Sequence, residues 1–260
     1  MAKDLAVAVI HGMGTQHSDF AEDMMDELND RIDESDRIAW QTIFWADVLQ
    51  PKQNAYLRRA NSKNDLDFFS LRKFVVGSVG DAAAYRRIDN DPGDTYGQIH
   101  TVVRDSIKKL YEENDKLDSQ AKPLIILAHS LGGHIMSNYI WDIQKNRPIV
   151  PPGNNRFERM RTLALIITFG CNIPLFTFAY QQIVPIRLPP GAKWMNYFDP
   201  DDVLGYPLKP INQAYRRTVS ADKTINVGGI LSSWNPLSHI RYWTDNSFTK
   251  PVARLISRFL

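Results

Sequence analysis

The sequence predicts an α/β fold with a mostly parallel central sheet and helices on both faces of the sheet. Short apolar runs alternate along the chain with segments of helical periodicity, and the runs are continuous, as in strands buried on both faces. The composition is that of a globular protein, with 43% hydrophobic and 23% charged residues among 260. We expect one domain over residues 1–260.

The first half of the chain contains two predicted strands and two predicted helices. Leu5–Ile10 is an apolar run that ends in a glycine motif, and Ile38–Trp45 has strand character. Asp19 is expected to cap a helix in which apolar side chains recur every four residues, at Phe20, Met24, Leu28 and Ile32. A second helical pattern comprises Ile99, Val102, Val103, Ile107 and Leu110. Residues 46–95 fit the alternation poorly, and we interpret them as a helical insertion on the sheet.

The second half continues the alternation. Leu124–Ala128 and Leu163–Phe169 are apolar strands, and Trp194–Phe198 and Thr224–Val227 are weaker strand candidates. Helical stripes follow at Ile135, Met136, Tyr139, Ile140 and Ile143, and then at Val252, Leu255, Ile256 and Phe259. Strand–helix–strand repetition of this kind connects parallel strands by right-handed crossovers.

Charge and cysteine content exclude several classes of protein. Lys and Arg total 31 against 29 Asp and Glu, so nothing favours a nucleic-acid partner. The single cysteine, Cys171, cannot form an internal disulfide, and we expect it to be a small buried apolar residue. No Cys/His cluster predicts a metal, and no cofactor is expected. We expect a cytoplasmic protein, because the sequence shows neither a targeting segment nor a convincing membrane span. It shows no lipid anchor and no clear amphipathic basic helix, which leaves membrane contact open.

The chemistry is concentrated in Leu124–His134, which reads LIILAHSLGGH. A buried strand ends at Ala128, Ser130 follows in a tight turn, and a helix starts at once. This order is typical of a nucleophile elbow, in which a sharp turn lifts a serine hydroxyl clear of the sheet. Ala128 and Gly132 are the small residues that the crowded turn requires, and His129 belongs to its scaffold. The alternative is a glycine-rich turn with an incidental serine.

A second motif, His11-Gly12-Met13-Gly14, follows the first strand. Glycines let backbone N–H groups turn toward a developing oxyanion, and the expected donors are the N–H groups of Met13 and Leu131. Leu131 stands at the start of a helix, where the dipole also favours negative charge. The alternative is a phosphate loop, which is disfavoured because neither G-x-x-x-x-G-K-[ST] nor G-x-G-x-x-G is present.

These motifs resemble the α/β-hydrolase fold, and within it the serine lipase and esterase branch. The matching segments are VIHGMGTQ (Val9–Gln16), LAHSLGG (Leu127–Gly133), ITFGCNIPL (Ile167–Leu175), FDPDDVLGYPL (Phe198–Leu208) and SHIRYW (Ser238–Trp243). The Asp-Pro-x-Asp stretch is also similar to intracellular phospholipase-like and GPI-inositol-deacylase-like members. The resemblance spans the chain but does not name a substrate.

The resemblance implies a Ser-acid-His order for a catalytic triad. Asp202 matches the family pattern best because an apolar pair follows it, while Asp201 and Asp199 remain open as alternatives. His239 follows a loop with Gly228 and Gly229 and precedes the last helix. Its Nε2 would take the Ser130 proton and its Nδ1–H would donate to Asp202.

The expected function is hydrolysis of a carboxylic ester, with an acyl-enzyme on Ser130 as intermediate. Residues 173–190 are rich in apolar side chains, and we interpret them either as a short cap that suits a hydrophobic acyl group or as ordinary core. The expected substrate is a small-molecule or lipid ester; thioester or amide chemistry would use the same residues. The alternatives are a catalytically silent α/β-hydrolase used for binding or assembly, and a nucleotide-binding α/β domain.

Overall fold

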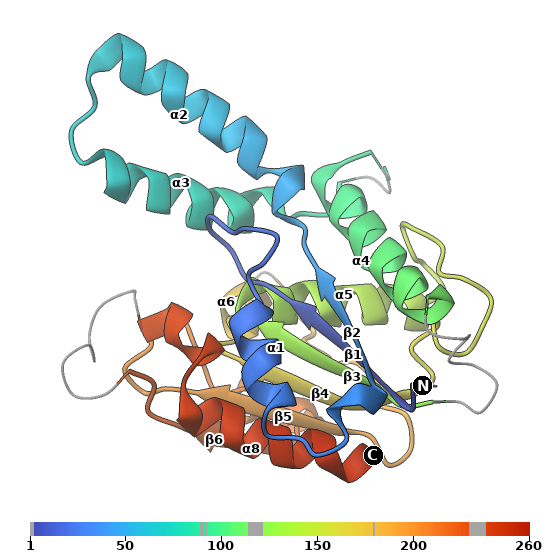
Figure 1. Cartoon of the computed structure of the whole chain (residues 1–260). Helices are drawn as coiled ribbons and strands as arrows, with labels where there is room; N and C mark the ends of the chain where they lie inside the picture. The colour runs from blue at the N-terminus through green and yellow to red at the C-terminus, as the bar shows by residue number, and fades with distance from the viewer. Residues whose placement is uncertain (1–2, 89–90, 92, 114–121, 179, 229–237) are drawn as a thin grey trace.

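The central sheet has six strands in the order β2-β1-β3-β4-β5-β6, and every neighbouring pair is parallel (Figure 1). The computed structural model describes residues 3–88, 91, 93–113, 122–178, 180–228 and 238–260. The strands are β1 (Leu5–Ile10), β2 (Ile38–Ile43), β3 (Leu124–His129), β4 (Leu163–Phe169), β5 (Lys193–Phe198) and β6 (Ala221–Thr224). The predicted α/β fold with a parallel sheet is confirmed.

Both faces of the sheet are buried, because each apolar strand contributes alternate side chains to two separate cores. In β1, Ala6, Ala8 and Ile10 face one core, and Leu5, Val7 and Val9 face the other. The first core packs under α4 (Thr95–Glu112) and α5 (Leu131–Gln144). The second packs under α1 (Glu22–Asn29) and α8 (Asn246–Ile256), which contact each other.

Two predicted elements have different bounds for identifiable reasons. Asp19 does not cap a helix with its side chain, since α1 begins at Glu22 after Ala21 and only the backbone carbonyl of Asp19 bonds to it. The strand expected at Thr224–Val227 ends at Thr224. Beyond it, the Val227 N–H donates to Asp199 and the Gly228 N–H to Asp245, so side chains take these donors from the sheet. Residues 229–237, with Gly229, lie outside the described residues.

Residues 46–95 contain a helical hairpin that projects from the sheet (Figure 1). It is formed by α2 (Gln50–Asn64) and α3 (Phe69–Ala84), joined by a turn with positive φ angles at Asp65 and Phe68. The remaining short helices are α6 (Ile173–Thr177) and α7 (Gln213–Thr218). Within the described ranges, no helix combines the length and apolar character needed to cross a membrane.

Candidate active site

Ser130 occupies a strained turn between β3 and α5. Its φ of 51° and ψ of −124° lie outside the regions that non-glycine residues favour, which costs about 1–3 kcal/mol. A hydrogen bond from the Ser130 N–H to the Phe169 carbonyl, 3.0 Å long, holds the turn. A Cβ atom at Gly12 would lie 2.5 Å from Ser130 Cβ, and one at Gly132 would lie 2.6 Å from the His11 carbonyl oxygen. Both motif glycines therefore let the first loop approach the serine.

The structure brings Ser130, His239 and Asp202 into one chain of hydrogen bonds. His239 Nε2 lies 2.7 Å from Ser130 Oγ, and His239 Nδ1 lies 2.8 Å from Asp202 Oδ2. All three residues are buried. With the proton on Nδ1, Nε2 is free to accept the hydroxyl proton of Ser130.

The other two aspartates lie elsewhere. Asp199 is buried and accepts hydrogen bonds from the N–H groups of Asp201 and Val227, so it holds the turn after β5. The side chain of Asp201 is exposed. Neither carboxylate contacts His239 in the described structure, so Asp202 is the aspartate that the fold brings to the imidazole.

Three donors surround the Asp202 carboxylate. Burial alone would raise its pKa, but hydrogen bonds from His239, the Leu204 N–H and the Tyr242 hydroxyl together lower it below the usual value. Asp202 is therefore ionised at neutral pH and orients the imidazole of His239.

The two motif histidines bond to backbone. Burial lowers the pKa of His129 well below its ordinary value, with the neighbouring His239 adding to the effect, so His129 is neutral. Its Nε2 lies 2.8 Å from the His239 carbonyl oxygen, and a hydrogen bond donated to that oxygen holds the backbone of His239 in place. Burial also lowers the pKa of His11 to about 3. His11 Nε2 accepts from the Trp45 N–H, which leaves Nδ1 to donate to the Gly12 carbonyl.

The N–H groups of Met13 and Leu131 belong to residues near Ser130: Leu131 follows the serine, and Met13 follows Gly12, whose added Cβ atom would lie 2.5 Å from Ser130 Cβ. Among the hydrogen bonds of the described residues, none uses either group as donor. Leu131 is the first residue of α5, where unpaired N–H groups and the helix dipole favour an anion.

The base of the helical hairpin holds the loop that carries Met13. The carboxylate of Asp81, on α3, accepts from the Gly14 N–H at 2.9 Å and from Gln53 Nε2, on α2, at 2.7 Å. The amide of Gln50 accepts from the Gln16 N–H and donates to the Gln16 carbonyl. Burial raises the pKa of Asp81 to about 6, against the lowering effect of its two hydrogen bonds.

Sequence reasoning missed two polar residues at the site. Tyr242 accepts from the Asp199 N–H and donates to Asp202, which connects the two buried aspartates. Asn172 is fully buried, and its Nδ2 lies 3.4 Å from Ser130 Oγ while its Oδ1 has no partner. The position of Asn172 just after β4 was a usable signal, because the carboxyl ends of parallel strands meet at one edge of the sheet.

The site is closed in this structure. Ser130 has no exposed surface, and His239 is 6% exposed. Residues 173–190 were interpreted either as a short cap or as ordinary core, and different side chains of this segment fit each interpretation. Phe176 stacks on buried His134 at 4.3 Å, as core packing does, whereas Phe178 is 82% exposed. In the described part of the chain, no group of His, Cys, Asp and Glu could hold a metal ion.

The chain was compared with protein families, curated proteins and solved structures. No family model matches the chain, and no curated protein matches it. Among solved structures, the chain is similar to a lipase-esterase related protein from Clostridium acetobutylicum ATCC 824, with 10% identity and a TM-score of 0.41. The alignment covers 99% of this chain and 95% of that chain.

Proposed function

We propose that the protein is a serine hydrolase of carboxylic esters and that it belongs to the α/β-hydrolase fold. The continuous hydrogen-bonded chain from Ser130 through His239 to Asp202 carries this proposal. The strained φ of Ser130 supports it, because strain of this kind persists where the surrounding structure requires it, as in nucleophile elbows.

The geometry supports a two-step reaction. His239 Nε2 takes the proton as Ser130 Oγ attacks the ester carbonyl carbon, and the N–H groups of Met13 and Leu131 donate to the oxyanion. The tetrahedral intermediate then expels the alcohol, which receives the proton from His239, and an acyl-Ser130 ester remains. Water, deprotonated by His239, attacks that ester and releases the acid and free Ser130.

The substrate that we propose has a hydrophobic acyl group and comes from a small-molecule or lipid ester. Ile173 and Phe176 lie on α6, which begins directly after Asn172, and Phe178 and Tyr180 are exposed apolar side chains that follow it. A thioester or an amide would be cleaved through the same residues.

The complete burial of Ser130 favours a second candidate, a silent α/β-hydrolase used for binding or assembly. The two candidates differ in the reactivity of the hydroxyl. An activated serine reacts with a fluorophosphonate, whereas a scaffold serine does not.

The test is intact-mass analysis after fluorophosphonate treatment, with the labelled peptide mapped. We expect one adduct on Ser130, none in Ser130→Ala, and strong loss in His239→Ala; comparable triads lose about 10⁶-fold in turnover. Asp202→Asn should label far more slowly, while Asp201→Asn, a neighbouring exposed acid, should label like the wild type. An unlabelled folded wild-type protein would support the scaffold candidate or a site that stays closed to the reagent. A positive result leads to a panel of esters of increasing acyl length.

A further inference from the structure

The projecting α2–α3 hairpin exposes a set of large apolar side chains. On α3, Leu71, Phe74, Val75 and Val79 recur at helical spacing with 44–62% of their surfaces exposed. Phe68, in the connecting turn, is 78% exposed, and Tyr56 on α2 is 57% exposed. Between the two helices lies a hollow of about 360 Å³, and four of these side chains, Tyr56, Phe68, Leu71 and Val75, are in its lining. Contiguous exposed apolar surface of this kind marks an interaction site.

The turn that presents Phe68 is itself strained. Phe68 has a φ of 55°, which is costly for a bulky side chain. Its ring is nevertheless mostly exposed, so burial of the ring does not offset this cost. A strained turn that holds an aromatic ring in solvent fits a surface that is covered in the working protein.

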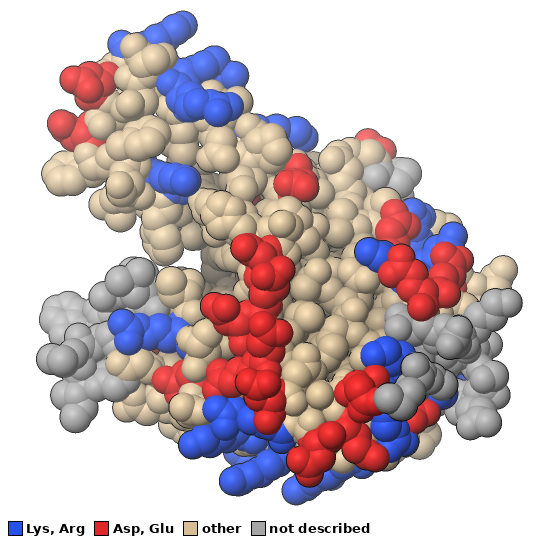
Figure 2. All heavy atoms as spheres, in the orientation of Figure 1, with Lys and Arg blue, Asp and Glu red and all other residues tan. Residues whose placement is uncertain are grey.

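Charge on the hairpin identifies the partner. Residues 50–84 contain six Lys and Arg, all exposed, against three Asp, one of which is the buried Asp81. Figure 2 shows basic side chains among uncharged residues on the projecting hairpin, whereas acidic side chains follow α1 on the body below. Asp65 and Asp67 lie in the turn between the helices. Their negative charges oppose a docking mode in which only this turn enters an anionic membrane. An apolar face flanked by basic side chains suits the headgroup and acyl boundary of an anionic bilayer.

We propose that the α2–α3 hairpin docks on an anionic lipid membrane. The apolar side chains of α3 enter the acyl boundary, and the Arg and Lys side chains contact lipid phosphates. This surface does not depend on whether Ser130 is a nucleophile.

The test is flotation of the Ser130→Ala protein, which cannot consume lipid, with vesicles of phosphatidylcholine alone or with added phosphatidylglycerol. We expect binding only to the anionic vesicles, and weaker binding at high salt. Leu71→Ser/Phe74→Ser and Arg58→Glu/Arg59→Glu should each lose about tenfold or more in affinity.

The matched controls are Val184→Ser, an exposed apolar residue elsewhere, and Lys250→Glu/Arg254→Glu on α8; both should bind like the parent protein. Circular dichroism verifies that each variant is folded. Equal binding to neutral vesicles, equal loss in the controls, or concentration-dependent dimerisation without vesicle binding would each overturn the proposal. Because the assay measures binding alone, an inactive serine leaves the outcome unchanged.

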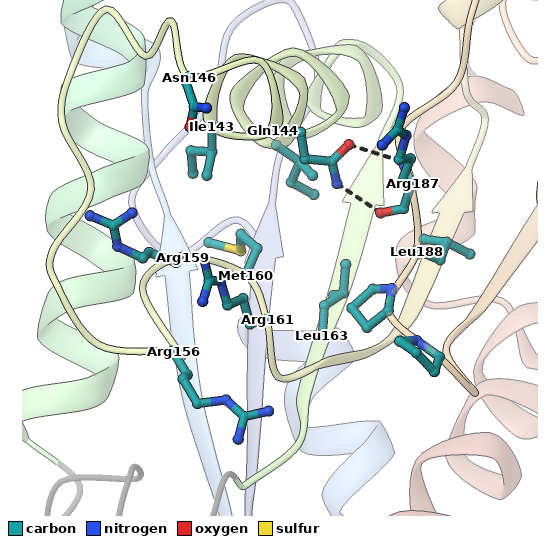
Figure 3. A pocket seen from close by; sticks show the side chains of 13 residues that line it. Ile143, Gln144, Asn146, Arg156, Arg159, Met160, Arg161, Leu163, Arg187 and Leu188 are labelled. Carbon is teal, nitrogen blue, oxygen red and sulfur yellow. Dashed lines mark hydrogen bonds between the residues drawn. The ribbon is translucent and has the colours of Figure 1, made fainter.

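A separate cavity carries a second inference. A hollow of about 450 Å³ lies where α5 ends and β4 begins, at the edge of the sheet opposite to Ser130. Its apolar lining includes Ile140, Met160 and Leu163, and its rim carries Arg156, Arg159, Arg161 and Arg187. Figure 3 shows Arg159 and Arg161 on one side, next to Met160, and Arg187 on the other.

The arginines of this rim lack acidic partners. Within the part of the chain that the structure describes, none of the four forms an ion pair with Asp or Glu. The rim segment is fixed, because the Gln144 amide accepts from the Arg187 N–H and donates to the Arg187 carbonyl. Arg159 Nε donates to the Gly153 carbonyl at 3.1 Å, and the other three arginines are exposed, so an anion in the hollow would meet positive charge on several sides.

The geometry points to a site for an organic phosphate. Arg guanidinium groups match phosphate oxygens in pairs, and the apolar lining takes the organic part. The volume falls within the range of small-molecule sites, about 300–1,000 Å³.

Isothermal titration with pyrophosphate, AMP and octyl phosphate tests this site and separates a nucleotide source from a lipid source. We expect at least one organic phosphate to bind more tightly than pyrophosphate, and octanoate to bind weakly. Arg159→Gln/Arg161→Gln should weaken binding about tenfold or more, whereas Arg216→Gln/Arg217→Gln on α7 should not. The pocket variant should also be at least as stable as the wild type at low salt without ligand. Failure of every probe to bind, or equal loss in both variants, would overturn the assignment.

Discussion

Replacing Asp81 by asparagine should stabilise the protein at neutral pH. The Asp81 carboxyl is 4% exposed, and burial raises its pKa from 3.8 to about 6. Since a tenfold change in a protonation equilibrium is worth about 1.4 kcal/mol, holding the ionised carboxylate costs the folded protein about 3 kcal/mol. Asparagine keeps an oxygen for the Gly14 N–H and carries no charge.

The sign of the pH dependence follows from the raised pKa. Between pH 4 and 6 the folded state binds more protons at Asp81 than the unfolded state does. The contribution of Asp81 to the free energy of unfolding is therefore fully present below about pH 4, and it is lost as the pH rises through about 6. Asp81→Asn should abolish this part of the dependence. It should match the wild type near pH 4 and exceed it by about 3 kcal/mol at pH 7.5, or about 6 °C in Tm for a chain of this length.

The assay is thermal unfolding of both proteins in buffers from pH 4 to 7.5 at one ionic strength. Asp33→Asn, on an exposed acid of the same type, controls for the change in net charge. If Asp81→Asn lowers Tm at pH 7.5, or if the two proteins lose stability in parallel across this range, burial of the charge is not what dominates at Asp81.

The same position connects stability with reactivity. Asp81→Ala removes the acceptor of the Gly14 N–H, so the loop that carries Met13 loses its tie to α3. We expect fluorophosphonate labelling of Ser130 to slow about tenfold in Asp81→Ala but to stay near the wild-type rate in Asp81→Asn. Equal labelling rates in the wild type, Asp81→Ala and Asp81→Asn would mean that the hydrogen bond from Gly14 to Asp81 does not position the Met13 N–H.

Three further predictions concern the immediate surroundings of the serine. Gly12→Ala places a Cβ atom 2.5 Å from Ser130 Cβ, so we expect a loss of about 1–3 kcal/mol in stability and at least tenfold slower labelling, measured by denaturation and mass spectrometry. Tyr242→Phe removes a donor to Asp202 and should raise the pKa of that acid and slow labelling about tenfold, with the deficit growing as the pH falls. Burial raises the pKa of the Cys171 thiol to about 12, so a disulfide reagent at pH 8 should react only after denaturant is added; prompt reaction with native protein would contradict this burial.

Local sequence determined the fold class and indicated the tight turn at Ser130. The apolar runs at β1, β3 and β4 are six or seven residues long, which favours strands buried on both faces and therefore helices on both sides of the sheet. The turn at Ser130 was indicated by the small neighbours Ala128 and Gly132, although the group that Gly132 leaves room for, the His11 carbonyl, comes from a distant segment. These signals depend on spacing along the chain, and spacing is visible in one sequence.

Contacts between distant segments were decided only by the tertiary structure. Asp199, Asp201 and Asp202 lie within one turn, and the fold alone turns Asp202 toward an imidazole 37 residues further on. Asn172 and Tyr242 join the site for the same reason, since strand ends that converge in a parallel sheet come from separate parts of the sequence. The sequence also did not predict that Ser130 is fully buried or that the apolar side chains of α3 are exposed. The exposure of a side chain depends on which other parts of the chain cover it.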